Sequence, residues 1–305
     1  MQFPERLSDY EIGGIGEIKR KTLRFHSYTR GMEGGEPALY AVYEKDAPPK
    51  LIEGYPDGQA LLVELCDLHL ALRGLRFEAQ TDRIERWCIE HVHPYYPYGD
   101  MERSAKYQND PEEYRDFFVN TIEAFCFPVA HMCADLERLY NDAMTAFSLR
   151  ALAEDEKYQA KRYWSRIHPS PKENLIQKWY EERPERRPRL IDQQLAQLPR
   201  FTMALDRDEQ SGKLVLVPEV TSVFEAAYYA LYRFAAVNAG MLSDYGGKTS
   251  LAFCQACGRA FIKNGNRQKY CADPVCQSVR NQRKSRDYYY RERKKEIARE
   301  LEELL

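Results

Sequence analysis

The sequence predicts an α+β fold, in which a predominantly helical body with short β-hairpins precedes a small cysteine-rich module and a long basic helix. Apolar residues recur at helical spacing in several segments, and shorter segments alternate apolar and polar residues around turns. Four of the eight cysteines gather after residue 250. Because 305 residues exceed a usual single domain, we expect a body over residues 1–245 and a separate module over 246–305.

The first half of the body is expected to hold one strand pair and several helices. Residues 1–50 alternate apolar and polar positions around Gly and Pro, which predicts a β-hairpin or a pair of strands. A helix with one buried face is predicted from the spacing of Leu61, Leu62, Leu65, Leu68, Leu72 and Leu75. Further helices are expected over 81–92 and from residue 110, the latter kinked or split by Pro128.

The end of the body gives the clearest predictions. The segments FTMALD and KLVLVPEV alternate around the turn-rich RDEQSG, which predicts a β-hairpin over 201–220. The following segment, VFEAAYYALYRFAAVNAG, is apolar nearly all round, and this is typical of a helix buried in the centre of a fold.

Composition indicates an ordinary soluble globular protein, with 44% hydrophobic and 30% charged residues. The chain shows neither a signal-peptide pattern at its start nor a long apolar run, so we expect a cytoplasmic protein without a membrane partner. In that compartment, cysteines are expected as reduced thiols or metal ligands. Helical patterns predict that four of them are buried apolar side chains: Cys66, Cys88, Cys126 and Cys133.

The other four cysteines have the spacing of a metal site. Cys254 and Cys257 are separated by two residues, thirteen residues follow, and Cys271 and Cys276 are separated by four. Four thiolates suit the tetrahedral coordination of one structural Zn²⁺, and a closed site of this kind leaves no position for catalysis. The residues between the pairs predict a hairpin, and Asp273 with Pro274 predicts the start of a helix that carries Cys276.

The order of knuckle, hairpin and helix is treble-clef-like. The motifs C-x2-C-G-R-x-F and R-Q-K-Y-C-x4-C, followed by an arginine-rich helix, resemble the CGNR-type zinc fingers of bacterial proteins over about residues 250–295. In this chain Gln277, Ser278 and Val279 follow the fourth cysteine in place of Gly-Asn-Arg. The resemblance implies a DNA-binding module on a larger body, in a bacterial protein and plausibly a transcriptional regulator.

The two parts of the chain differ in net charge. From Cys254 onward 13 Lys and Arg stand against 7 Asp and Glu, a net charge of +6, which leaves −8 for the remainder. Such a basic end favours a polyanion, and we expect DNA in preference to RNA. The predicted contacts lie on the hairpin and on one stripe of the terminal helix: Arg259, Lys263, Arg267, Lys269, Arg280, Arg283, Lys284, Arg291, Lys294 and Lys295.

Other interpretations stay open at this point. The helix charges could form a solvated face while an apolar row packs on the body or a second copy as a homodimer: Val279, Tyr290, Ile297, Leu301 and Leu304. The module could instead bind RNA or the ribosome, or serve as a structural or protein-binding part of an enzyme or assembly factor.

No catalytic motif is found in the sequence; GGKTS at 246–250 lacks the first glycine of a phosphate loop. Cys88, His91 and His93 have no second ligand pair nearby.

Overall fold

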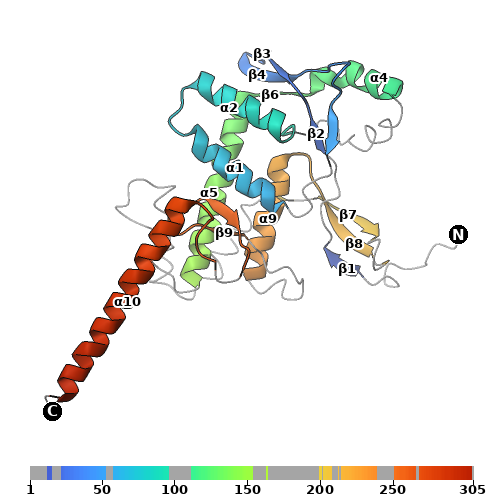
Figure 1. Ribbon diagram of the computed structural model, residues 1–305. Coiled ribbons are helices and arrows are strands. Elements are labelled where there is room, and N and C mark those ends of the chain that lie inside the picture. Colours follow the sequence, from blue (N-terminus) through green and yellow to red (C-terminus); the bar gives the residue numbers. More distant parts are fainter. Residues whose placement is uncertain are drawn as a thin grey trace. The chain divides into compact units, whose positions relative to one another are not determined.

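Helices and small, mainly antiparallel sheets together build this protein, which confirms its expected mixed character (Figure 1). The chain divides into two compact units, Met1–Thr249 and Ser250–Leu305. The computed structural model describes residues 12–15, 22–52, 58–95, 111–153, 163, 199–200, 202–207, 212, 214–238, 251–265 and 268–303.

The first unit, called the body below, combines helices with short strands. Its helices are α1 (Gln59–Leu72), α2 (Phe77–Glu90), α4 (Pro111–Thr121), the 3-10 helix η3 (Ile122–Ala124), α5 (Val129–Ala153) and α9 (Val223–Asn238). Its strands are β1 (Ile12–Ile15), β2 (Thr22–Arg24), β3 (Tyr28–Glu33), β4 (Glu36–Ala41), β5 (Lys50–Ile52), β6 (Cys126–Pro128), β7 (Thr202–Arg207) and β8 (Leu214–Glu219).

The strands form three small sheets. β3 and β4 pair as a hairpin whose turn residues, Gly34 and Gly35, have φ of 57° and 88°, as a two-residue hairpin turn requires. β6 pairs with β4 on its other side, and β2 pairs with β5. The predicted hairpin near the end of the body is present as β7 and β8, and β1 adds to β8 in parallel.

Helices α1, α5 and α9 pack against one another and supply much of the body's core. The predicted face of α1 is buried at five of its six leucines, whereas Leu75 lies beyond the helix end and is 41% exposed. Its inclusion in that face was wrong, because the helix ends at Leu72 and the chain turns through Gly74 with φ of 76°. As predicted for a central helix, α9 is buried from Val223 to Leu231 except at Glu225, which is half-buried.

Pro128 does not kink a continuous helix. The chain leaves α4 through η3, forms strand β6, and begins α5 at Val129. The strand is held in place by pairing with β4, from Tyr40↔Cys126 to Ala38↔Pro128. Cys126 therefore lies on a strand and is only partly buried, as is Cys133, whereas Cys66 and Cys88 are fully buried as expected.

Gly58 allows α1 to begin close to α9. Its φ is 67°, and a Cβ at this position would lie 1.9 Å from the backbone oxygen of Ala226. Gly74, at the other end of α1, has a similar φ of 76°, but nothing lies within 4 Å of a Cβ built there. Both glycines have a positive φ, which L-residues rarely adopt. Of the two, only Gly58 also lies where a Cβ would clash with a neighbouring backbone atom.

Gly58→Ala should therefore destabilise the body more than Gly74→Ala. Both variants bear the cost of an L-residue at positive φ, about 1–2 kcal/mol. Gly58→Ala adds an overpacking cost of about 1–3 kcal/mol because the backbone of α9 must move. Denaturant unfolding followed by a signal from the body measures the difference, and equal midpoints for the two variants would contradict this account.

Candidate metal centre

The first two cysteines lie in a tight turn between two short strands of the second unit. β9 (Leu251–Phe253) pairs antiparallel with β10 (Ala260–Ile262), and the turn between them carries Cys254 and Cys257. Gly258, with φ of 75°, donates its N–H to the carbonyl of Cys254 at 2.8 Å. The N–H groups of Ala256 and Arg259 point at the Sγ atoms of Cys254 and Cys257, at 3.4 and 3.5 Å. This turn directs both sulfurs to the same side.

The chain then returns to the turn and delivers the third cysteine. The N–H of Gln268 donates to the carbonyl of Gly265 at 3.0 Å, which closes the turn after β10. The N–H of Gln255 donates to the carbonyl of Lys269 at 3.0 Å, which fastens the returning segment beside the first pair. Cys271 follows two residues later and is brought close to Cys257.

The fourth cysteine lies in the first turn of helix α10 (Pro274–Glu303). The Asp273 carboxylate accepts the N–H groups of Val275 and Cys276, at 2.8 and 3.4 Å, and so caps the helix. Pro274 occupies the first helical position, where a missing N–H costs nothing. Cys276 is 2% exposed and packs with Cys254 and Phe261.

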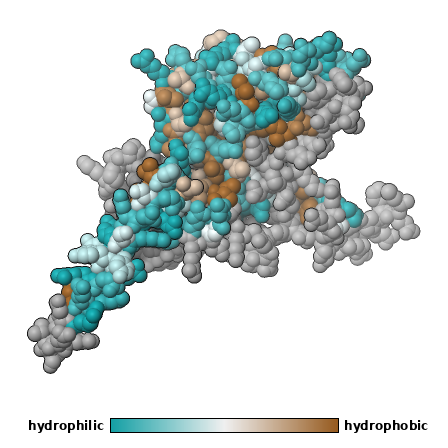
Figure 2. Space-filling view, viewed as in Figure 1, coloured by the Kyte–Doolittle hydropathy of each residue, from teal (hydrophilic) through white to brown (hydrophobic). Residues whose placement is uncertain are grey.

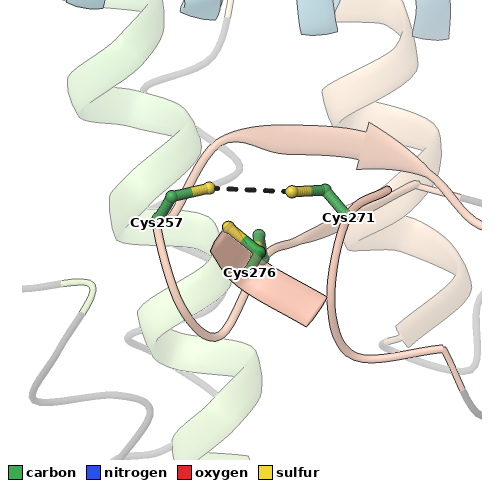
Figure 3. Close-up of side chains that lie close together, drawn as sticks. Cys257, Cys271 and Cys276 are labelled. Atoms are coloured by element: carbon green, nitrogen blue, oxygen red, sulfur yellow. Dashed lines mark hydrogen bonds between the residues drawn. The ribbon is translucent and has the colours of Figure 1, made fainter. Parts of the chain in front are cut away.

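The four Sγ atoms all lie within 4.8 Å of one another. Sulfurs at the corners of a tetrahedron with Zn–S bonds of about 2.3 Å would be about 3.8 Å apart. The Sγ atoms of Cys257 and Cys271, which face each other in Figure 3, are separated by 3.8 Å. All four thiols are free, so the spacing is not that of disulfides. The cluster could hold one metal ion such as zinc.

Local electrostatics favour the thiolate form of Cys254 and oppose that of Cys271 and Cys276. Burial opposes ionisation of Cys254, but the backbone N–H groups of Cys271, Cys257 and Ala256 outweigh it and lower the pKa of its thiol to about 6. Burial raises the pKa of Cys271 to about 11 and raises the pKa of Cys276 well above its ordinary value; the Cys254 thiolate adds to both shifts. A bound dication would remove this conflict because it stabilises all four thiolates together.

The structure places most of the predicted nucleic-acid contacts on the second unit's surface. Lys269, Arg280, Arg283 and Lys284 line one groove of about 930 Å³, together with Gln255, Gly265, Gln268, Tyr270, Gln277 and Asp287. Arg259 and Lys263 flank β10 and do not line this groove, and Arg267 is outside the described residues. Arg291, Lys294 and Lys295 are exposed farther along α10, whose surface is largely hydrophilic in Figure 2.

Sequence reasoning missed the uncharged lining of this groove. Three glutamines and Tyr270 lie between the cations, and none of them was predicted as a contact. The available signal was their position: Gln268, Lys269 and Tyr270 immediately precede the third cysteine, and Gln277 immediately follows the fourth. Residues adjacent to ligands of one metal must lie near one another in space.

The second candidate metal set is not assembled. Cys88 is fully buried in α2, and His91 Nδ1 lies 3.1 Å from the Glu64 carboxylate. His93 Nδ1 lies 3.1 Å from the Tyr28 hydroxyl inside an aromatic cluster, where burial lowers the pKa of the imidazole to about 3. Among the described residues the four C-terminal cysteines form the one group of three or more potential ligands. The GGKTS segment is outside the described residues.

The body has a cleft of its own with an ionisable lining. It measures about 810 Å³, and its ionisable lining consists of His26, Tyr43, Lys45, Asp46, Lys50, Glu112 and Arg115. The described lining contains no cysteine, serine or threonine, so a nucleophile of these types is missing from it.

Comparisons with protein-family models, curated proteins and solved structures found no match to this chain. In the part of the chain that the structure describes, every helix is too short or too polar to cross a membrane.

The cluster predicts one equivalent of zinc per chain, lost when one ligand is removed. Cys257 is exposed, so Cys257→Ser should abolish tight zinc binding without opening a cavity. Cys126 is a partly buried thiol of the body, and Cys126→Ser should keep the full zinc content. Elemental analysis of both purified variants makes the comparison. Zinc retained in Cys257→Ser at the wild-type level would exclude the four-cysteine site.

Proposed function

We propose that the second unit is a treble-clef-like zinc finger related to the CGNR type, which binds nucleic acid, with DNA as its first target. The observation that carries the proposal is the joint position of four thiols and four cations: the groove lined by Lys269, Arg280, Arg283 and Lys284 lies directly beside the cysteine cluster. Structural zinc contributes on the order of 10 kcal/mol to such small modules. The metal therefore takes the place of a large core and fixes the cations for a polyanion.

The charge of the helix supports the same proposal. Between Arg280 and Lys295 eight Lys and Arg stand against Asp287 and Glu292. Each phosphate that such a side chain neutralises releases condensed counterions, which favours binding at low salt. The helix is anchored to the cysteine cluster at its first turn, so its cations keep a fixed orientation relative to the groove.

Binding should be strongly salt-dependent and should require zinc. If the four groove cations contact phosphates, the logarithm of the association constant should fall with the logarithm of salt with a slope of about −3 for a single strand or −4 for a duplex. Fluorescence anisotropy with labelled DNA and RNA of equal length measures this slope. Cys257→Ser should lose the affinity, and Cys126→Ser should keep it.

The same titration separates the possible roles. Sequence-dependent affinity for duplex DNA would support a transcriptional regulator, and tighter binding to RNA would favour an RNA-binding or ribosome-associated protein instead. Absence of binding to every nucleic acid at about 50 mM salt would exclude the proposal, since electrostatic binding is much stronger at this salt concentration than at about 200 mM. The finger would then be a structural or protein-binding module.

A further inference from the structure

The groove beside the cysteine cluster is more than a positive surface. Its volume of about 930 Å³ is in the range of sites that enclose small ligands, about 300–1,000 Å³. Four cations and the Asp287 carboxylate give the lining a net charge of +3. Three side-chain amides and one aromatic ring lie among these charges. Such a lining can bind phosphates and also the hydrogen-bonding edges and flat faces of bases.

Hydrogen bonds connect the groove to the metal ligands. The Gln277 amide donates to the carbonyl of Cys271 and accepts from the Arg280 guanidinium at 3.0 Å. Arg283 donates to the Tyr270 hydroxyl at 3.1 Å, and its guanidinium carbon lies 5.9 Å from the centre of that ring. Two of the groove's arginines are thus held by residues next to Cys271 and Cys276, so the groove is preorganised where the cluster is intact.

A concave site of this kind suits an unpaired strand. In a duplex the bases are stacked inside and the phosphates form the convex outer surface, so amides within a depression cannot reach base edges. In a single strand the bases are free to enter such a depression, stack on aromatic rings and donate amino groups to a carboxylate such as Asp287. This arrangement of amides, one ring and one carboxylate among cations favours unpaired nucleic acid.

The groove face continues along α10. At about 100° per residue, Tyr288, Arg291 and Lys295 lie within about 40° of Lys284, and Lys294 lies on the groove side as well. Arg286 and Tyr289 lie on the opposite side of the helix, about 160° and 140° from Lys284. Tyr288 and Tyr289 are equally exposed, at 64% and 63%. Exposed tyrosine on the groove face offers a stacking surface next to the cations.

We propose that this groove binds a single unpaired nucleic-acid strand, with phosphates against Lys269, Arg280 and Lys284 and bases against the amides, Tyr270 and Tyr288. The inference rests on the proposed function of the second unit and specifies its ligand. From the groove the strand follows α10 toward Arg291 and Lys294. Gln277 and Tyr270, which adjoin the ligands Cys276 and Cys271, hold the base nearest the metal site.

The test uses matched pairs of variants in the full-length, zinc-loaded chain. The probe is a labelled single strand of mixed sequence and about 16 nucleotides, the upper end of known single-strand site sizes, beside its duplex. The single strand should bind at least about tenfold more tightly. Lys284→Gln should weaken it severalfold and reduce the salt slope by about 0.7, whereas Arg286→Gln should change the slope little.

The tyrosine pair tests stacking independently of charge. Tyr288→Ala should weaken single-strand binding at least about fivefold, the effect of losing one stacked base, and Tyr289→Ala less than about twofold. All four side chains are exposed, so the variants should keep wild-type zinc content and helicity. Equal effects within both pairs, or duplex binding as tight as single-strand binding, would overturn the groove inference while leaving nucleic-acid binding intact. Absence of binding to either probe would exclude the proposed function itself.

Discussion

Four sulfur atoms within 4.8 Å of one another cannot all carry negative charge without a cation between them. Backbone N–H groups stabilise one thiolate, at Cys254, and burial opposes ionisation of Cys271 and Cys276. A dication at the centre would change repulsion into attraction, and the free energy gained would hold a turn, a two-stranded hairpin and the start of a helix together. The described cluster of buried apolar side chains around the ligands is small: Cys254, Phe261 and Cys276 form it, with Ala252, Ala256, Tyr270 and Cys271 packed at its edge. Metal coordination would therefore have to provide the stabilising free energy that this small apolar core does not.

The body is stabilised differently. Its core consists of leucines and aromatic side chains from α1, α5 and α9 and from the sheet of β3, β4 and β6. Two tyrosines, the half-buried Tyr95 and the buried Tyr228, donate their hydroxyls to the carboxylates of Asp135 and Asp142 of α5, each at 2.8 Å. These are neutral-to-charged hydrogen bonds inside an apolar environment, where leaving either partner unpaired is costly. The body thus relies on apolar burial, whereas the second unit has a small apolar core and would draw on metal coordination.

Local patterns in the sequence were sufficient for elements whose partners are near in the chain. The spacing of four cysteines, the capping Asp273, the buried face of α1 and the hairpin of β7 and β8 all follow from short-range periodicity or turn chemistry.

The elements that were missed depend on distant partners. The segment around Pro128 becomes a strand because β4 is beside it, and β1 joins β8 from about two hundred residues away in sequence. The polar lining of the groove was missed for the same reason, since Gln268 and Gln277 become neighbours only when the thiols converge. A periodic pattern reports burial on one face; it does not report which polar side chains will share a depression.

Helix α10 has 30 residues, so it is about 45 Å long, and its first turn alone carries a cysteine of the cluster. Because the cluster holds α10 at its first turn, a tilt at that turn displaces the far end of the helix. Tilting its base by about 10° would move its far end by about 8 Å at this length. If a metal is bound, a small change in coordination geometry at Cys276 would therefore be magnified into a large displacement of the charges near the C-terminal end of α10.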